Sequence, residues 1–595
     1  MVKKFFLNML TSFMGAWLAI VCAGVAAVVI IMGIVGSAVS GSMETVEKNS
    51  VMRVSLDGTI VERESMSELN LMTLLNKDFS QVQSVETLTA AIRAAASDDR
   101  VKCIYLDCGF VQAAPASLNA VRGALTEFRK SGKKIYAYAD QLTQGAYFVA
   151  SAADEISLNP AGEVMLNGLG GQSLFFKGLF DKVGVQFQAV RVGKGKAAVE
   201  PYTQDTMSSV ARQQNMQLID TLWLQIRRQI AADRKDVTPA KIDTLINRDF
   251  ISAKPAQYAL AQKIVDKLEY RHAFEDRIAK AAGQEDGLEK EVSASAMAMY
   301  DDKFSANTNA GNQIAVLYAC GAIDDMMGGG GIDSEVLTEQ ILDLADDDNV
   351  KALVLRVNSP GGSAFGSEQM WEALETFKKT GKKFVVSMGD YAASGGYYIS
   401  CGADRIFADE YTVTGSIGIF GLIPNCKGLL DMAGVNVETV ATNPAGVYGT
   451  GLTPLDEQQL AAMQSMVENG YELFVSRVAA GRKMTAEKVK TIADGRPLSA
   501  VVAKDFGLVD QLGSLGDAID WASRAGKIEN PELVAYPQVE MNFMAFMGNM
   551  QNSLLMKLIN TDNPKQAVQD ILSAVQVEYG SGKVMASMPP FRVGF

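Results

Sequence analysis

The two halves of this chain repeat each other, which restricts the fold to two similar units. The segment Phe176-Lys-Gly-Leu-Phe-Asp-Lys-Val-Gly184 returns as Cys426-Lys-Gly-Leu-Leu-Asp-Met-Ala-Gly434, an offset of 434 − 184 = 250 residues. Leu88-Thr89 returns as Leu337-Thr338 at 337 − 88 = 249, so one indel in the 134–140 region separates the two registers. Residues present in both copies are interpreted as fold, and residues present in one copy only are candidates for function.

Two differences between the copies stand out. The second copy has Ser394-Gly395-Gly396 where the first has Gln144-Gly145-Ala146. The first copy has Lys196, whereas the equivalent position, 196 + 250, holds Gly446. A serine in one half and a lysine in the other predict a single site assembled from both halves.

The composition excludes several kinds of catalytic, metal-binding and nucleotide-binding site. The sequence has one histidine, His272, in the charged run 271–276, where a surface position is expected. A Ser-His-Asp triad, a Cys-His pair and a multi-histidine metal site all need imidazole in a cleft. No Cys-x-x-Cys pair, Walker A loop or Gly-x-Gly-x-x-Gly motif after a strand is present. Hydrolytic chemistry must therefore proceed without histidine, and the net charge of −13 argues against a nucleic-acid partner.

The cysteines show no disulfide framework. The sequence contains six of them: Cys22, Cys103, Cys108, Cys320, Cys401 and Cys426. Because Cys22 lies in the apolar N-terminal run, an odd five remain, and their spacings match no disulfide pattern. We expect them to be small buried hydrophobic residues.

The N-terminal region has the composition of a membrane segment. Residues 5–43 carry no charge, and 13–36 is long enough to cross a bilayer as a helix. Lys3 and Lys4 precede this run and should stay in the cytoplasm, which places everything after about residue 44 on the far side. A cleaved signal peptide is the alternative, given the small residues at 36–40. The length of the apolar run favours a retained anchor.

Each copy alternates strands and helices, which predicts an α/β fold with parallel strands joined by right-handed crossovers. Each opens with a strand that runs into a Gly-x-Ile turn, at Gly58 and at Gly321. The expected order along the chain is a cytoplasmic N-terminus 1–12, a transmembrane anchor 13–36, a first domain 45–283, a polar linker 284–312, a second domain 313–535 and a tail 536–595 of unassigned role.

Ser394 follows the predicted strand 384–388 and is surrounded by small residues. Amides and the dipole at a helix start favour a developing anion, but a helix N-cap serine is the simpler alternative. The motif Asn358-Ser-Pro-Gly-Gly-Ser363 favours the catalytic interpretation, because the amides of Gly361 and Gly362 can point outward as an oxyanion hole requires. The first copy has lost both glycines together with the serine.

Lys196 is the candidate general base. It lies in Val192-Gly-Lys-Gly-Lys-Ala-Ala-Val-Glu-Pro201, followed by apolar residues. A lysine can replace histidine when burial or nearby positive potential lowers its pKa from about 10.4 toward about 7–8. Lys194 is the rival candidate, and a solvated surface lysine is the ordinary role of this residue type.

Four motifs in this order resemble the long, duplicated form of the signal peptide peptidase A (protease IV) family, in the ClpP/crotonase-like superfamily. The resemblance extends from the N-terminal anchor to about residue 535. The motifs that carry it are Lys196-Ala-Ala-Val-Glu-Pro201, Val357-Asn-Ser-Pro-Gly-Gly-Ser363, Met388-Gly-Asp-Tyr-Ala-Ala-Ser-Gly-Gly-Tyr397 and Thr414-Gly-Ser-Ile-Gly-Ile-Phe-Gly421.

The resemblance implies two tandem ClpP/crotonase-like domains, each a ββα superhelix, after an N-terminal transmembrane helix. It implies a Ser/Lys dyad with Ser394 as nucleophile and Lys196 as general base. Ser416 would orient the lysine amine. The oxyanion hole would come from the amides of Gly361, Gly362 and Gly395. No metal and no cofactor is implied.

The resemblance also implies a cellular role. The expected protein is a serine endopeptidase anchored once in the bacterial inner membrane, with its catalytic domains in the periplasm. It would degrade cleaved signal peptides and similar apolar peptides. The expected assembly is a homotetramer, a closed ring in which only the junction between first and second copy holds both dyad residues.

Two other functions fit the same fold class. An acyl-CoA hydratase or isomerase could use the glycine amides as an enolate hole, but it needs carboxylates near the thioester, and none stands beside the Gly361 and Ser394 motifs. A non-catalytic membrane scaffold is the other alternative. The joint presence of Ser394, Lys196 and Ser416 with the paired glycines argues against it.

Overall fold

The computed structural model describes residues 44–63, 82–301, 303–304, 311–324, 331–537 and 584–587. The anchor predicted for 13–36 and most of the tail 536–595 lie outside these ranges. Among the residues that the structure does describe, no helix combines the length and the apolar character needed to cross a membrane.

The first copy is built around a parallel sheet with strand order β2-β1-β3-β4-β5-β7, and β8 also pairs with β1. Its strands are β1 (Ser50–Val61), β2 (Val82–Ser84), β3 (Val101–Gln112), β4 (Lys134–Thr143), β5 (Glu155–Met165), β7 (Lys267–Leu268) and β8 (Glu291–Ser293). The parallel pairing follows from the helices that link successive strands, as the alternating sequence pattern predicts.

The second copy repeats this arrangement with strand order β18-β16-β14-β12-β9-β20, and β15 pairs with β14 and β19. Its strands are β9 (Gln313–Cys320), β12 (Val350–Ser359), β14 (Lys383–Ala393), β15 (Arg405–Ala408), β16 (Val413–Gly415), β18 (Pro497–Ser499), β19 (Gln511–Leu512) and β20 (Glu532–Tyr536). All pairs are parallel except that between β16 and β18.

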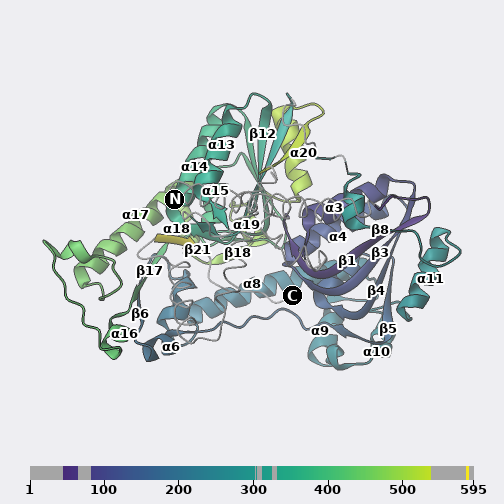
Figure 1. The fold of residues 1–595 in the computed structure, drawn as a ribbon, viewed down its shortest axis with the longest axis horizontal. Coiled ribbons are helices and arrows are strands. Elements are labelled where there is room, and N and C mark those ends of the chain that lie inside the picture. Colours follow the sequence, from purple (N-terminus) through teal and green to yellow (C-terminus); the bar gives the residue numbers. More distant parts are fainter. Residues whose placement is uncertain are drawn as a thin grey trace, which may run out of the picture.

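Helices cover both sheets (Figure 1). Those of the first copy are α3 (Val85–Ser97), α4 (Pro115–Arg129), α5 (Gln144–Ala150), α6 (Lys177–Lys182), α7 (Glu200–Thr203), α8 (Ser209–Asp233), α9 (Pro239–Asn247), α10 (Ala256–Ala261), α11 (Arg271–Ala282) and α12 (Ala294–Ala298). Those of the second are α13 (Ser334–Asp346), α14 (Ala364–Lys379), α15 (Gly395–Ser400), α16 (Lys427–Met432), α17 (Glu457–Arg482), α18 (Ala486–Ile492), α19 (Ala500–Asp505) and α20 (Leu515–Gly526).

A third sheet joins the two copies, with strand order β11-β10-β13-β21-β17-β6. Its strands are β6 (Gln186–Arg191), β10 (Ile323–Asp324), β11 (Ile332–Asp333), β13 (Gly361–Ser363), β17 (Phe420–Asn425) and β21 (Val584–Ser587). Strand β6 of the first copy runs antiparallel to β17 of the second, from Arg191 opposite Phe420 to Gln186 opposite Asn425. This pairing carries the loop after β6, which contains Lys196, to the second copy.

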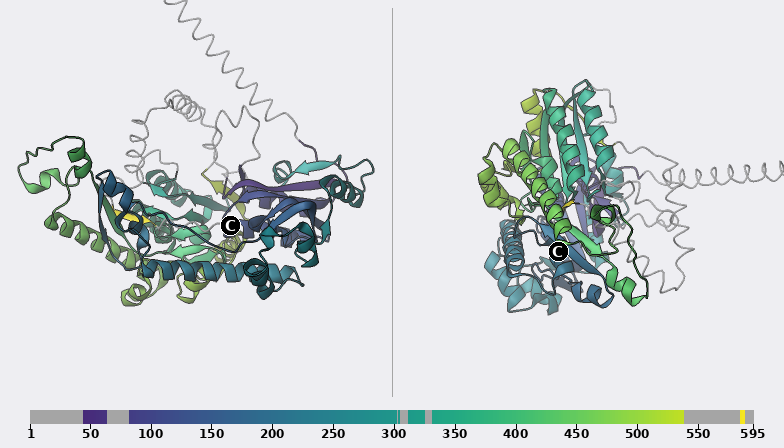
Figure 2. Two further views of the ribbon diagram at one scale, coloured as in Figure 1. Left: turned by 90° about the horizontal axis from the view of Figure 1, so that it is seen from below. Right: turned by 90° about the vertical axis from the view of Figure 1, so that its left-hand side faces the viewer.

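Helix α8 returns the chain from this third sheet to the first copy. Its buried residues Leu218, Leu222, Ile226 and Ile230 recur every fourth position and pack into the core of the first copy. Figures 1 and 2 show α8 spanning the distance between β6 and the first sheet. The first copy therefore consists of a sheet and an extension made of β6, the loop after it and α8. This extension contacts the second copy through the pairing of β6 with β17.

The repeated segments form equivalent helices with equivalent ion pairs. In α6, Lys177 pairs with Asp181 at 2.6 Å, and in α16, Lys427 pairs with Asp431 at 2.7 Å. The segments also touch, because the amide of Leu429 donates to the carbonyl of Gly184 at 2.8 Å.

Two local expectations need correction. The Gly-x-Ile turn predicted at Gly58 is wrong, because β1 continues to Val61 and Gly58, with φ 75°, forms a bulge against β3. At Gly321 the turn is confirmed, since β9 ends there and β10 enters the third sheet. The polar stretch 284–312 also contains β8 and α12, whose Val292 and Met297 are buried in the first core.

Candidate active site

Lys196 and Ser394 meet where the two copies join, although 198 positions separate them in the sequence. Lys196 Nζ lies 2.8 Å from Ser394 Oγ, and both residues are 0 % exposed. Lys196 stands in the loop after β6, and Ser394 comes directly after β14. The structure therefore brings together, within one chain, the two residues that the comparison of the copies singled out.

Ser394 has a strained backbone that aims its hydroxyl away from the helix it precedes. Its φ is 55° and its ψ −113°, a conformation that a non-glycine residue rarely adopts. Its amide donates to the carbonyl of Gly415 at 2.8 Å. Its side chain makes no capping hydrogen bond to α15. The helix N-cap alternative is therefore wrong for this serine.

The Lys196 amine lies among serine oxygens. Nζ is 3.0 Å from the carbonyl and 3.1 Å from the hydroxyl of Ser416. The Ser416 hydroxyl lies 3.1 Å from the carbonyl of Gly495 and can donate its hydrogen there, so its oxygen is left to accept from the amine. A neutral amine can donate both N–H bonds to Ser416, leaving its lone pair toward the hydroxyl of Ser394.

Burial lowers the pKa of the Lys196 amine well below its ordinary value of 10.5. Desolvation disfavours the charged form, since no solvent reaches the side chain. The nearest acidic residue along the sequence, Glu200, pairs with Arg191 instead. Lys194, the rival base, is exposed to solvent. Of the two lysines, the structure places Lys196 beside the serine.

Glycines allow the loops around Lys196 to pack closely. A Cβ on Gly495 would lie 2.8 Å from Lys196 Cβ, and one on Gly195 would lie 2.8 Å from the carbonyl of Asp494. A Cβ on Gly418, in the loop before β17, would lie 3.5 Å from Lys196 Cδ. The side chain is thereby enclosed by backbone, which explains its complete burial.

Strand β13 places two glycine amides at the same end of the second sheet. Gly361 has φ 102°, and its amide donates to Ser359 Oγ at 3.2 Å. A Cβ on Gly362 would lie 1.9 Å from the carbonyl oxygen of Ile323, so only glycine fits there. Gly395 is the first residue of α15, where a helix leaves its amides without intrahelical acceptors. Glycine amides therefore lie at the ends of the two strands, β12 and β14, that lead to this site, and that of Gly361 is engaged with Ser359.

Comparisons with known proteins agree with this chemistry. The profile described as "Peptidase family S49" matches two stretches, residues 127–285 and 376–529. "Protease 4" of Salmonella typhi is 35% identical over 553 residues, covering 90% of this chain and 87% of that protein. This chain belongs to peptidase family S49. It is a serine protease.

Other relatives are similar over most of their length. "Protease 4" of Haemophilus influenzae is 32% identical, covering 79% of this chain and 76% of that protein. "Serine protease SPPA, chloroplastic" of Arabidopsis thaliana is 28% identical, covering 82% and 70% respectively. Among solved structures, ClpP1 from Listeria monocytogenes covers 34% of this chain and 92% of its own, with 17% identity and a TM-score of 0.22.

One residue of the lysine motif of this S49 peptidase positions the loop. Glu200 is 2 % exposed and accepts two hydrogen bonds from Ser208, from the hydroxyl at 2.7 Å and the amide at 3.0 Å. Arg191 lies 3.8 Å from Glu200 and donates to the carbonyl of Lys196 at 3.0 Å. Glu200 therefore anchors the loop that contains Lys196 to the start of α8. The sequence pattern did not predict this role.

Buried polar contacts that no sequence motif marks also hold the two copies together. Arg356 forms a buried ion pair with Glu62 of the first copy at 2.7 Å. Asp390 accepts from the amide and the hydroxyl of Ser117 at 2.8 and 2.5 Å. Burial raises the pKa of the Asp390 carboxyl. Asn358 donates to Asp390 at 3.1 Å, so these motif residues form one network across the junction.

Breaking the buried ion pair should destabilise the junction strongly. We expect Glu62→Ala to lower the free energy of unfolding by about 3–5 kcal/mol, because it leaves the Arg356 guanidinium buried without its partner. The double variant Glu62→Gln with Arg356→Met should lose less than Glu62→Ala alone, since no unpaired charge remains. Thermal unfolding of the three proteins measures both effects. Equal losses in the single and double variants would contradict this account.

In the first copy, the position equivalent to Ser394 is occupied by a glutamine that is bonded to the backbone. Gln144, at the position of Ser394, accepts from the amides of Asn167 and Gly168 at 3.1 and 2.8 Å and donates to the carbonyl of Gly168 at 3.1 Å. Gly168 is equivalent to Gly418, since 168 + 250 = 418. One amide side chain therefore ties the start of α5 to the loop that, in the second copy, faces Lys196. Gly446, equivalent to Lys196, is exposed.

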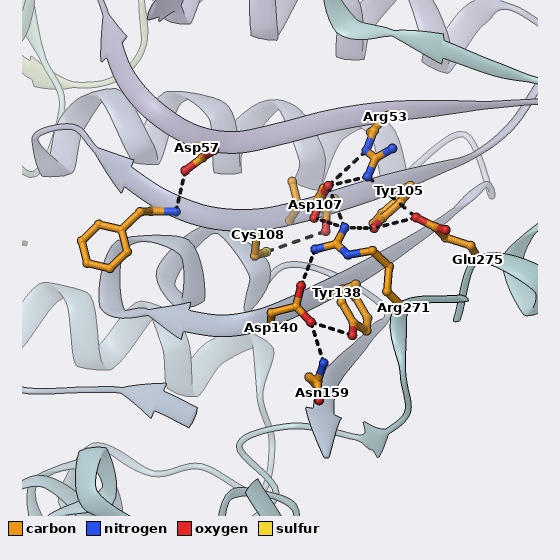
Figure 3. A network of polar contacts seen from close by, with 12 residues as sticks. Arg53, Asp57, Tyr105, Asp107, Cys108, Tyr138, Asp140, Asn159, Arg271 and Glu275 are labelled. Atoms are coloured by element: carbon orange, nitrogen blue, oxygen red, sulfur yellow. Dashed lines mark hydrogen bonds and ion pairs between the residues drawn. The ribbon is translucent and has the colours of Figure 1, made fainter. Parts of the chain in front are cut away.

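The charged cluster of the first copy is paired within itself (Figure 3). Arg271 donates to Asp107 at 2.9 Å and to Asp140 at 2.8 Å, and Arg53 contacts Asp107 at 2.6 Å. Asp107 and Asp140 thus each have a guanidinium partner, which is typical of a structural network. His272 is exposed beside it, as the sequence predicted.

Most of the cysteines that the structure describes are small buried residues of the core. Cys103, Cys108 and Cys401 are buried, as predicted, while Cys320 and Cys426 are partly exposed. Burial raises the pKa of the Cys103 thiol to about 12, which keeps it protonated and inert.

Proposed function

We propose that this S49 peptidase cleaves peptide bonds through a dyad in which Ser394 is the nucleophile and Lys196 the general base. The distance of 2.8 Å between Lys196 Nζ and Ser394 Oγ, at full burial of both, carries the proposal. A buried amine without a carboxylate partner is neutral at a lower pH than an exposed lysine and can accept a proton.

The reaction follows from the positions of these groups. As Ser394 Oγ attacks the peptide carbonyl, its proton passes to Lys196 Nζ, while Ser416 holds the amine in place. Amides at Gly362 and Gly395 stabilise the oxyanion, and that of Gly361 can join them when it exchanges its hydrogen bond to Ser359 Oγ. Lys196 then protonates the leaving amine, and a water molecule activated by the same lysine hydrolyses the ester on Ser394.

The third sheet suggests how a substrate is held. Strands β13 and β17 flank one strand position beside the dyad, and a peptide in that position would be extended and bound through its backbone. Binding through the backbone accepts substrates with many different side chains. We propose apolar peptides, including cleaved signal peptides, as substrates, in line with the apolar N-terminal run that the sequence predicts to be a membrane anchor.

The location and assembly remain part of this proposal. A single anchor over 13–36 would hold the peptidase at the inner membrane with the described domains in the periplasm. A homotetrameric ring is the proposed assembly. Since Lys196 and Ser394 meet within one chain, a tetramer would contain four such sites.

Cleavage of a synthetic apolar signal-peptide-like substrate tests the function. We expect the full-length wild type and Lys194→Ala to cleave it, because Lys194 is exposed to solvent and Lys196 is the lysine that contacts Ser394. Ser394→Ala should be inactive. Mass spectrometry should find an acyl adduct on Ser394 when a slowly hydrolysed ester is supplied. Activity that survives in Ser394→Ala would refute the dyad and favour a non-catalytic second copy.

The pH dependence should report the lysine. Because only the neutral amine can accept the serine proton, kcat/KM should rise tenfold per pH unit below the lowered pKa of Lys196 and level off well below pH 10.5. The measurement is the pH profile of kcat/KM for the full-length enzyme. A profile that is flat from mildly acidic to alkaline pH would contradict a lysine base.

A further inference from the structure

The strand that leads to Ser394 carries one residue more than its equivalent in the first copy. Strand β14 has 11 residues and β4 has 10. The pairing of β4 with β5 skips one residue, Asp140, whereas the equivalent pairing of β14 with β15 and β16 skips two, Gly389 and Asp390. The opposing stretches, 159–162 and 409–412, are equally long. The extra residue of the second copy therefore belongs to the pair Gly389-Asp390.

On the other side of β14, the same pair forms a bulge against β12. The paired residues that border the bulge are Val357 with Met388 and Ser359 with Ala392. One residue of β12, Asn358, thus stands opposite three residues of β14, 389–391. A bulge bends its strand and changes the direction of the side chains that follow. Ser394 comes two alanines after this bulge, so its direction depends on the shape of the bulge.

The side chain of Asn358 closes the bulge. Its carbonyl oxygen accepts from the amide of Tyr391 at 3.1 Å, and its amide group donates to Asp390 at 3.1 Å. Asn358 also opens the motif that continues from β12 into β13. One side chain therefore connects the segment that leads to the glycine amides of β13 with the segment that leads to Ser394.

Helix α4 of the first copy holds Asp390 from the opposite side. The carboxylate accepts from the amide and the hydroxyl of Ser117 at 2.8 and 2.5 Å. Ser117 is the third residue of α4, and the cap residue Ala114 makes no side-chain hydrogen bond to this helix. A carboxylate at a helix N-terminus binds free amides and complements the helix dipole. Asp390 therefore supplies, from the second copy, the cap that α4 lacks.

The acid in the corresponding stretch of the first copy has a different environment. The side chain of Asp140 is 50% exposed and pairs with Arg271, whereas Asp390 is 8 % exposed. A buried carboxylate is costly unless hydrogen bonds satisfy it, and Asp390 accepts three. Gly389 also faces the first copy, because a Cβ there would lie 3.0 Å from Glu62 Oε2. Both residues of the bulge pair are thus placed against the first copy.

We propose that Asp390 is a positioning residue for Ser394, through which the contact with the first copy sets the geometry of the active site. The inference rests on the proposed function of Ser394 and Lys196. Asp390 acts through Asn358, which fixes the bulge before the nucleophile and the start of the glycine motif. The first copy therefore contributes twice to the site: its extension brings Lys196, and its helix α4 aligns the serine.

Two variants of the full-length chain test this role. Asp390→Ala removes all three hydrogen bonds, whereas Asp390→Asn keeps an acceptor for the Ser117 amide and places an NH2 group against the amide group of Asn358. We expect kcat on an apolar peptide to fall at least about tenfold in both, with KM within about twofold, because the nucleophile is misaligned and peptide binding is kept. Activity is measured well below the thermal midpoint of each protein.

Thr238→Ala is the matched control. It removes the exposed cap of α9, whose hydroxyl accepts from the amide of Lys241 at 3.2 Å, and should lower the thermal midpoint without changing kcat. Hydrogen exchange adds a readout that does not depend on catalysis. In the Ser394→Ala background, Asp390→Asn should speed exchange of the amides of 389–396 at least about fivefold, and Thr238→Ala should not.

The outcomes separate this inference from the catalytic one. Wild-type kcat with unchanged exchange at 389–396 in the Asp390 variants would overturn the positioning role. A fall in kcat that only follows the thermal midpoint, and that Thr238→Ala shows equally, would overturn it as well. An inactive wild type, or an active Ser394→Ala, would refute the proposed function instead, and the exchange measurement would still decide whether Asp390 fixes the bulge.

Discussion

Replacing Lys196 by methionine is expected to lower kcat/KM by at least about 10³-fold. Methionine preserves the length and apolar stem of the side chain but cannot accept the Ser394 proton. The members of a catalytic unit act together, so losing the base removes most of the rate even though Ser394 and the oxyanion amides remain. The measurement is kcat/KM of the full-length variant on an apolar peptide.

The controls distinguish lost chemistry from lost folding. Lys196→Met removes a buried amine, so its thermal midpoint should be equal to that of the wild type or higher. Lys194→Met, two residues away and exposed, should retain activity within about twofold because a surface substitution changes little. If Lys196→Met retained activity while Lys194→Met lost it, the assignment of the base would be wrong.

The two residues of the proposed dyad could be singled out from the sequence because the chain contains two copies that can be compared. Lys196 and Ser394 each occur in one copy, opposite Gly446 and Gln144. The strand and helix periodicity also placed main elements, such as the strand expected over 384–388, which lies within β14 (Lys383–Ala393). The positions of strands and helices follow from local sequence patterns. The two site residues follow from chemistry, because glycine cannot act as a base and glutamine cannot act as a nucleophile.

The contacts between the copies could not be predicted in the same way. Glu62 and Arg356 are 294 positions apart, and nothing local marks either residue as half of a buried pair. The strained backbone of Ser394 results from its bond to Gly415 and the turn into α15, which depend on the assembled sheet. Propensity and periodicity report on neighbours along the chain, whereas these features are fixed by tertiary packing.

The structure also shows how the first copy keeps the same strand-to-helix connection without a serine at this position. In the first copy, Gln144 satisfies three backbone groups of the loop near Gly168 through its amide. A serine is too short to make those bonds while it faces a lysine. Once glutamine occupies this position, the strand-to-helix connection is stabilised by hydrogen bonds and no longer supports a nucleophile.

Gly362→Ala should produce the second large loss, a fall in kcat of at least about 10²-fold. The added Cβ would lie 1.9 Å from the carbonyl oxygen of Ile323, which belongs to the backbone of β10 and cannot rotate away. Strand β13 must therefore move, and with it the amides of Gly361 and Gly362. Removing a single oxyanion donor typically costs 10²–10³ in kcat, about 2.7–4 kcal/mol.

A matched glycine provides the control for this variant. Gly123 lies exposed in α4 with no atom within 4 Å of its Cβ position, so Gly123→Ala should leave kcat unchanged and stabilise the helix by about 0.5–1 kcal/mol. For Gly362→Ala we expect a large fall in kcat and only a small change in the thermal midpoint, because the displaced strand is short and lies at the site. Full activity in Gly362→Ala would transfer the oxyanion role to the amide of Gly395, whose position at the start of α15 does not depend on β13.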